Sequence, residues 1–379
     1  MSLLLDAVSS SVSHFNDGRC TESASFQLRL LEFHDGSPHP LALQPSIDIA
    51  LPTMETHYIG HRMHMSTMGS YIVIAAGLPP ERTGIDVLFL VDWQTGHVTT
   101  VSKHQYLFNN PANVSPKLCS TRPRTYLTDF LVLSDNVLAL IRGSENAIEL
   151  CRIDTASTAS LKTICLLELP PLLPYARLSS ASVKTESNPS AFATHRRPRQ
   201  PPRYPFFPSP TDALALLTLT AKISGSAFVD TRTYTLATHA RTLLSYASPA
   251  PSPLSELSSL PVLVPWDAWG PLATRCFDGP GGSSDAVVAG QRLFDSGVIR
   301  DFCPHRVRAA AGRTGLRSTL AAGRVFACDI ESTLPYSEVS LVRDDGTFAD
   351  DAMIDKDRLV FLTKAVSDFR RCLYYPAVT

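Results

Sequence analysis

The chain has 379 residues, of which 44% are hydrophobic and 18% are charged, and its 34 basic and 35 acidic residues leave a formal net charge of −1. This balance excludes wholesale binding to nucleic acid or to anionic membranes, because both need a large basic surface. The 29 prolines exceed the average usage of about 5%. They favour short strands joined by loops over long helices.

The N-terminal stretch lacks the features of a signal peptide. Its apolar run is three leucines, it is interrupted by Asp6, and no basic residue precedes it. No segment approaches the roughly 18 uninterrupted apolar residues of a transmembrane helix. The eight cysteines include no C-x-x-C pair, which predicts mostly free thiols in a reducing compartment. We therefore expect a cytoplasmic protein, with the nucleus as the alternative location, and no membrane association.

The first part of the chain predicts strands. Residues 1–24 are expected to be an N-terminal segment with a short helix, and residues 25–177 the first half of one domain. Residues 70–77 are apolar at consecutive positions, which predicts a strand covered on both faces. Residues 87–101, VLFLVDWQTGHVTTV, predict a hairpin with Thr95-Gly96 in its turn.

A second group of strands follows, and it is expected at residues 130–133, 137–141, 148–153 and from 161 onward. Asp92 and Asp154 end corresponding strands, which gives a period of 154 − 92 = 62 residues. That period exceeds the roughly 40 to 45 residues of a standard four-stranded propeller blade. The repeat is therefore degenerate, with long loops inside it.

Residues 178–210 are polar and proline-rich without periodicity, and we expect a disordered insertion there. Residues 211–379 form the expected second half of the same domain, with strands within 211–230, 232–247, 285–297, 323–332, 337–345 and 357–366. Strands that follow strands, with almost no helix between them, predict an all-β fold. We expect an irregular β-propeller with degenerate WD-like blades and proline-rich inter-blade loops, rather than a sandwich or barrel.

The segment FLVDWQTGHV resembles the end of a WD-repeat blade, with the Trp-Asp pair transposed to Asp92-Trp93. A second resemblance covers residues 25–365. The chain resembles the β-rich C-terminal region of F-box-type proteins of mushroom-forming fungi, through LVDWQTG, FLVLSDNVLAL, IELCRI, CLLELP, YTLATHARTLL, VPWDAWGP, RDFCPHRVRAA and ESTLPYSEV in that order. This resemblance implies a propeller derived from the substrate-receptor part of a ubiquitin ligase.

The F-box helical module that precedes this region in the family has no counterpart between Met1 and Ser25. We therefore expect either a truncated chain or a stand-alone relative. Ubiquitin-ligase components are expected as partners only if an F-box lies upstream.

Two pairs of residues invite a metal or nucleophile interpretation. His61 and His64 lie three apart, but on a strand that spacing points the rings to opposite faces, and no further ligand is near in sequence. Cys303 lies two residues before His305, and Pro304 between them is typical of a turn. We expect neither pair to bind a metal or to perform catalysis.

The acidic and glycine-rich turns also match no catalytic or nucleotide-binding motif. Residues 277–285, FDGPGGSSD, place Ser284 where a dinucleotide-binding loop needs its third glycine. Residues 342–348 do not match the Asp-box turn of sialidases. The pairs Asp344-Asp345 and Asp350-Asp351 are expected to cap exposed turns.

Two further segments could contact partners. Residues 195–203, HRRPRQPPR, are expected to be a solvated loop, with a targeting signal or a docking segment as the alternative. Trp266 and Trp269 are expected to pack in the core rather than to form an exposed aromatic clamp.

The sequence thus predicts a monomeric, non-catalytic protein-interaction scaffold with an unidentified protein partner, no cofactor, no catalytic or metal site and no nucleic-acid ligand. The alternative is a propeller enzyme or a binder of carbohydrate or another small ligand. That alternative requires carboxylates, arginines or tyrosines that converge from several blades on a central channel. A third hypothesis is a non-functional remnant of an expanded gene family.

Overall fold

The structure is a computed structural model, and it describes residues 3–16, 19–32, 35–50, 54–55, 62–68, 70–77, 87–102, 127–154, 160–185, 212–223, 230–248, 261–279, 286–295, 297–310, 314–315, 317–340, 351–354, 358–363 and 371–376. Strands make up most of these residues, and all but one pair of neighbouring strands with a defined register is antiparallel. The predicted all-β class is therefore confirmed. None of the helices within these ranges combines the length and the hydrophobicity that crossing a membrane would require.

The chain divides into two compact units. The N-terminal unit is formed mainly by Met1–Arg124, and the C-terminal unit mainly by Thr125–Arg152, Lys162–Asn188 and Gln200–Thr379. The boundary between the units thus falls near residue 124, whereas the sequence suggested two halves separated by residues 178–210. That these units are parts of one ring stays a prediction.

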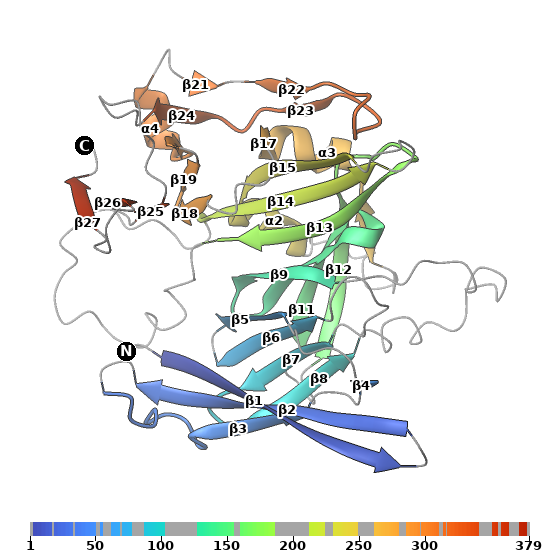
Figure 1. The fold of residues 1–379 in the computed structure, drawn as a ribbon. Helices are drawn as coiled ribbons and strands as arrows, with labels where there is room; N and C mark the ends of the chain where they lie inside the picture. The colour runs from blue at the N-terminus through green and yellow to red at the C-terminus, as the bar shows by residue number, and fades with distance from the viewer. Residues whose placement is uncertain are drawn as a thin grey trace. The chain divides into compact units, whose positions relative to one another are not determined.

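The N-terminal unit contains two sheets of four strands (Figure 1). In the first sheet β2 lies between β1 and β3 and also pairs with β4; the second has the order β5-β6-β7-β8. The strands are β1 (Leu3–Asn16), β2 (Arg19–Glu32), β3 (Ser46–Ala50), β4 (Met54–Glu55), β5 (Arg62–Met68), β6 (Tyr71–Gly77), β7 (Val87–Asp92) and β8 (His97–Ser102).

The core of this unit follows the two-residue alternation of its strands. One hydrophobic cluster takes alternate residues from four strands: Phe26, Leu28 and Leu30 from β2, Ile47 and Ile49 from β3, Ile72 and Ile74 from β6, and Phe89 and Val91 from β7. Val73 and Leu90, on the opposite faces of β6 and β7, are also fully buried. Both faces of β6 are therefore covered, as the sequence predicts.

The turn of the predicted hairpin is built by Asp92. Its Oδ1 accepts hydrogen bonds from the backbone N–H groups of Gln94 (3.0 Å) and Thr95 (3.3 Å), and its carbonyl oxygen accepts one from Gly96 (2.8 Å). Gly96 has φ +78°, a conformation that favours glycine. Trp93 is buried in the core cluster. Asp92 and Trp93 thus have the turn-forming and packing roles that the sequence predicts.

The segment before β3 is held against this turn. The His39 ring is buried and lies edge-on to Trp93, with ring centroids 5.2 Å apart. Leu43 N–H donates to the carbonyl oxygen of Gln94 (3.0 Å). The side chains of Leu41 and Leu43 remain exposed beside this anchored ring.

The C-terminal unit begins with two sheets. The first has the order β16-β12-β11-β10-β9, with β16 parallel to β12, and the second has the order β13-β14-β15-β17, in which β14 lies between β13 and β15 (Figure 1). Their strands are β9 (Leu127–Ser134), β10 (Val137–Arg142), β11 (Ala147–Asp154), β12 (Ser160–Glu168), β13 (Ala176–Lys184), β14 (Leu214–Ile223), β15 (Asp230–His239), β16 (Val262–Val264) and β17 (Thr274–Gly279).

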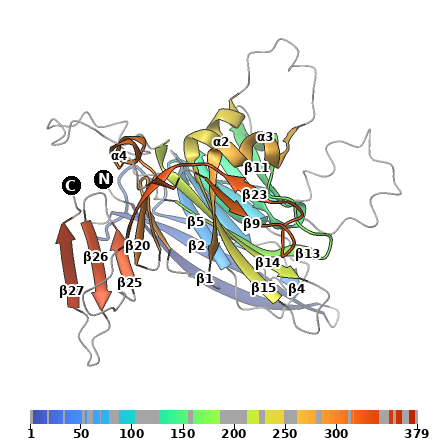
Figure 2. The same ribbon diagram turned by 90° about the horizontal axis from the view of Figure 1, so that it is seen from above.

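Three smaller sheets complete this unit: one in the order β18-β19-β20-β24-β21, the pair β22-β23, and the three strands β25, β26 and β27, which lie side by side in Figure 2. They are β18 (Val287–Ala289), β19 (Arg292–Asp295), β20 (Val298–Asp301), β21 (Thr314–Gly315), β22 (Ser318–Leu320), β23 (Ile330–Ser332), β24 (Tyr336–Ser340), β25 (Asp351–Ile354), β26 (Arg358–Thr363) and β27 (Arg371–Pro376).

The described helices are short. They are the 3₁₀ turn η1 (Gly143–Glu145) and the α-helices α2 (Ala240–Ala247), α3 (Trp266–Ala273) and α4 (Pro304–Ala309). In α2 the buried residues Ala240, Leu243 and Ala247 recur at helical spacing. In α3 both tryptophans are buried, with their rings 5.3 Å apart and edge-to-face. The packing role predicted for Trp266 and Trp269 is confirmed.

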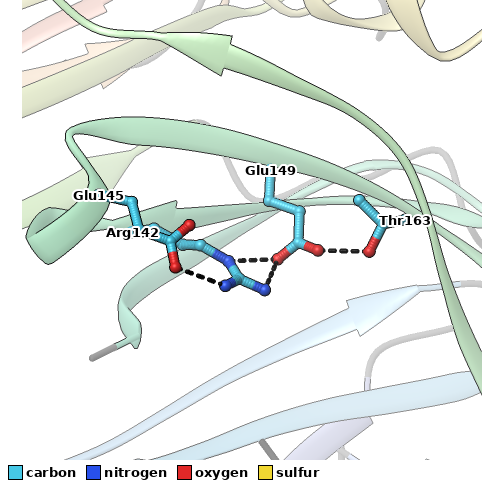
Figure 3. A network of polar contacts seen from close by, with 4 residues as sticks. All are labelled: Arg142, Glu145, Glu149 and Thr163. Atoms are coloured by element: carbon cyan, nitrogen blue, oxygen red, sulfur yellow. Dashed lines mark hydrogen bonds and ion pairs between the residues drawn. The ribbon is translucent and has the colours of Figure 1, made fainter. Parts of the chain in front are cut away.

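A buried ion pair joins three strands of the first sheet (Figure 3). Glu149 on β11 is 2% exposed and lies between Arg142 on β10 and Thr163 on β12. Its carboxylate accepts hydrogen bonds from Arg142 Nε (2.5 Å) and from Thr163 Oγ1 (2.5 Å). Arg142 Nη1 also donates to the partly exposed Glu145 (3.0 Å). Both oxygens of the buried carboxylate are therefore hydrogen-bonded.

Three expectations from the sequence are wrong. Leu3–Asn16 is a strand rather than a helix, because it pairs along its whole length with β2, the next strand in the chain, and this pairing overrides a weak local preference for helix. Residues 178–184 belong to β13 rather than to an insertion. The strand predicted within 232–247 ends at His239 and continues as α2. Residues 186–211 lie outside the described residues.

We predict that Glu149→Gln destabilises the protein by about 3 kcal/mol, because it removes the buried acidic partner of Arg142 and leaves this arginine paired with the partly exposed Glu145. Glu145→Gln is the matched control, since it removes a more exposed partner of the same arginine and should cost less than about 1 kcal/mol. Urea unfolding of both variants measures the difference. Equal effects would contradict the central role of Glu149.

We predict that Gly270→Ala destabilises the C-terminal unit by about 1–3 kcal/mol through overpacking. A Cβ at Gly270 would lie 2.3–2.4 Å from ring atoms of the buried Trp266. Gly279→Ala is the control, because its Cβ would meet nothing closer than a backbone oxygen at 3.4 Å. Thermal unfolding should leave this control within about 0.5 kcal/mol of the wild type.

We predict that stability falls as the pH drops below 6.5, the ordinary pKa of histidine. Burial lowers the pKa of His39, against the opposing effect of Glu32, and burial likewise lowers the pKa of His239. The folded state therefore binds fewer protons than the unfolded state, so its stability is complete above the unfolded pKa and is lost below it. Melting temperatures of His39→Gln and His239→Gln between pH 5 and 8 should show a weaker dependence, while the exposed His305→Gln should match the wild type.

Candidate functional site

A hollow of about 320 Å³ opens in the C-terminal unit, where β17, β20 and β24 approach one another. Side chains from five strands line it: Arg275, Cys276, Phe277 and Asp278 from β17, Asp295 from β19, Val298 and Arg300 from β20, Ser318 from β22, and Tyr336 from β24. The hollow brings two arginines and two aromatic rings together.

Both arginines lie over aromatic rings. The Arg275 Cζ is 4.8 Å from the centroid of the Tyr336 ring, and the Arg300 Cζ is 4.6 Å from the centroid of the Phe277 ring. The two rings meet edge-to-face, with centroids 5.7 Å apart. Each guanidinium is attracted by the face of its ring, which fixes its plane. The four side chains therefore form one Arg–aromatic cluster.

Ion pairs hold Arg300 from the side. Its Nε donates to Glu338 on the opposite position of β24 (3.0 Å), and its Nη1 donates to Asp295 at the end of β19 (3.5 Å). Arg275 Nη1 donates to the carbonyl oxygen of Ser332 (3.5 Å). These contacts preorganise the arginines, because the cost of ordering long side chains is met on folding rather than on binding.

The positively charged residues of the hollow are more deeply buried than the negatively charged ones. Arg275 is 4% exposed and the side chain of Arg300 is 16% exposed, whereas the side chain of Asp295 is 26% exposed and Asp278 is an exposed residue. The arginines therefore form the floor of the hollow and the aspartates its rim. The lining balances two positive and two negative charges.

The hollow offers no activated nucleophile. Burial, reinforced by Asp278, raises the pKa of the Cys276 thiol to about 12. The thiolate is the nucleophilic form, so Cys276 is unreactive at neutral pH. Within the described ranges no group of three or more His, Cys, Asp or Glu residues is placed to hold a metal ion. The arginines and aromatic rings of the hollow are held in place before any ligand arrives, which suits binding.

The segment after β20 is organised by Asp301. This buried carboxylate pairs with Arg292 (3.1 Å) and Arg306 (3.5 Å) and accepts a hydrogen bond from Cys303 N–H (2.9 Å). Cys303 precedes the first turn of α4, and His305 is exposed on that helix. Pro304 is the first residue of α4 rather than part of a simple turn, and Cys303 and His305 lie at the N-terminus of that helix.

The other sequence candidates do not come together at the hollow. Phe277 and Asp278, at the start of the glycine-rich segment, line it; residues 280–285 lie outside the described residues. His64 lies on β5 in the N-terminal unit. His61 and residues 195–203 and 342–350 also lie outside the described residues, whereas Asp351 is the first residue of β25.

Sequence reasoning missed Arg275, Arg300 and Tyr336 as members of one site. They are separated by up to 61 positions (336 − 275), and no local motif links them. The sequence segments VIRDF and LPYSEV predict two short strands, and each strand contains one of these side chains, Arg300 or Tyr336. Neither segment indicates that the two strands pair. Their convergence requires the pairing of β20 with β24.

No protein-family model matches the chain, and no curated protein matches it. Among solved structures, the chain is similar to the WD40 domain of SCAP from fission yeast. The alignment covers 94% of this chain and 71% of that chain, with 7% sequence identity and a TM-score of 0.32. A likeness at this level supports no conclusion about function, and the resemblance to F-box-type proteins stays an expectation.

Proposed function

We propose that the protein is a non-catalytic interaction scaffold that binds a partner protein through a surface that includes the Arg–aromatic cluster. The carrying observation is that two arginines, each stacked on an aromatic ring, line one preformed hollow. Arginine and aromatic residues are enriched at the centres of protein interfaces, where a few side chains provide most of the binding energy.

The repeated antiparallel sheets support a proposal for the fold as a whole. Four-stranded antiparallel sheets such as β5-β6-β7-β8 are the units from which propeller blades are built. We infer a degenerate WD-like propeller, derived from the substrate-receptor part of an F-box-type protein. In this proposal the protein is a monomer in the cytoplasm or nucleus, and ubiquitin-ligase subunits join it only through an upstream F-box.

A small-ligand binder is the second candidate function. The hollow volume of about 320 Å³ lies at the lower end of the ~300–1,000 Å³ typical of ligand pockets. Arginine, tyrosine and carboxylate side chains from several strands also converge there, which this alternative requires. The rim is open to solvent through the exposed Asp278, so a segment of a protein partner can reach it.

The test is affinity purification of C-terminally tagged protein from the organism that encodes it, after chemical cross-linking and with quantitative mass spectrometry. We compare wild type with Arg300→Lys, which retains the charge but loses the planar fork that both acidic neighbours contact. Arg308→Lys is the matched control, because Arg308 is exposed on α4 and, among the described residues, donates to the carbonyl oxygen of Pro304.

We expect at least one protein to be recovered with wild type and Arg308→Lys but reduced about tenfold with Arg300→Lys, which is the loss that ~1.4 kcal/mol produces. Equal recovery with all three baits would exclude the hollow as the binding surface. Recovery of a cullin and its adaptor would support the ligase origin. If no protein is recovered but a low-molecular-weight compound co-purifies with the tagged protein, the second candidate function is favoured.

A further inference from the structure

The positions of the charged residues in the hollow indicate which kind of side chain it binds. The floor is positive, through the nearly buried Arg275 and Arg300, and the rim is negative, through Asp278 and Asp295. A ligand that matches this order carries a negative group at its tip and a positive group behind it. Resting on the proposed function, we propose that the hollow receives a Glu or Asp side chain of the partner, flanked in the partner's sequence by Lys or Arg.

Arg300 supplies the donors for the carboxylate. A guanidinium has five N–H groups in a planar fork. Arg300 Nε donates to Glu338, and its Nη1 donates to Asp295. The contact to Asp295, at 3.5 Å, is longer than the 2.7–2.9 Å of a strong charge-assisted hydrogen bond. An incoming carboxylate can therefore compete with Asp295 for Nη1.

Arg275 strengthens this attraction from below. Its guanidinium lies against the Tyr336 ring, and the ring in turn contacts Phe277 and Phe302. Apolar walls lower the local dielectric, so the attraction between an arginine and a carboxylate is stronger there than in water. The Ser318 hydroxyl, 2.8 Å from the Ser332 hydroxyl, adds a polar group to the same wall.

The rim explains why a basic neighbour is needed. A wholly acidic segment would place further carboxylates beside Asp278 and Asp295, and like charges in contact reduce affinity. A Lys or Arg next to the bound carboxylate pairs with the rim instead. The same repulsion disfavours phosphate groups, which carry nearly two negative charges. The rim thus selects against polyanions such as nucleic acid.

Two kinds of ligand share the chemistry that the hollow is proposed to bind. A carboxylate with an adjacent cation occurs in a peptide with acidic and basic neighbours, and also in a free amino acid such as glutamate. The proposal commits to the peptide because the open rim leaves room for a chain to pass across the hollow. Free glutamate is one arm of the test.

The experiment is fluorescence polarisation with the full chain and labelled seven-residue peptides. The probe has the sequence Gly-Ser-Lys-Glu-Lys-Ser-Gly, the first control replaces Glu by Gln, and the second replaces both Lys by Glu. We expect the probe to bind about tenfold more tightly than the Gln peptide, the effect of one charge-assisted hydrogen-bond pair. The all-acidic peptide should also bind more weakly than the probe.

Two variants connect this selectivity to the hollow. Arg300→Lys should weaken probe binding about tenfold, whereas Arg308→Lys should not change it. Asp278→Asn, on the exposed rim, should improve binding of the all-acidic peptide by about two- to fivefold. Because Asp278 is exposed, this variant tests the rim even if the arginine variant folds poorly.

The outcomes separate the two proposals. Equal affinity for the probe and its Gln analogue, or no probe binding, overturns the carboxylate inference. If cross-linked partners are still lost with Arg300→Lys, the scaffold proposal survives that failure. If 10 mM glutamate displaces the probe as well as excess unlabelled probe does, the ligand is the free amino acid, and both the peptide inference and the scaffold proposal fail.

Discussion

Two-residue alternation along paired antiparallel strands is the constraint on which the described structure depends. It places Phe26, Leu28 and Leu30 on one face of β2, where they meet Ile72 and Ile74 of β6. A register shift by one residue would turn all of these side chains toward the opposite face. Register is therefore fixed by burial, and the turns between strands have to match it, as the Asp92 turn does.

The same alternation controls where charge can be buried. The buried Glu149 lies between Arg142 and Thr163, and its two carboxylate oxygens accept hydrogen bonds from these side chains of the neighbouring strands (Figure 3). Asp301 is buried in the same way between Arg292 and Arg306. A buried carboxylate is tolerated only with such partners, since its desolvation is costly. These pairs restrict which strands can be neighbours.

The hollow combines both features. Arg275 and Phe277 lie two residues apart on β17, so they share a face, and Arg300 and Glu338 face each other across β20 and β24. Stacking on rings and pairing with acids fixes the arginines before any ligand arrives. Burial keeps the thiol of Cys276, beside these arginines, protonated at neutral pH.

The sequence by itself determined the strands whose pattern is local: β6, the β7–β8 hairpin and β9 to β12 were all predicted close to their observed bounds, because consecutive apolar residues and turn residues mark them directly. It also predicted the buried tryptophans of α3. Tertiary structure alone decided that the chain leaves β15 as a helix, and that Arg275, Arg300 and Tyr336 meet. These features depend on contacts between residues far apart in the chain, and a local pattern carries no information about which distant strand a segment will pair with.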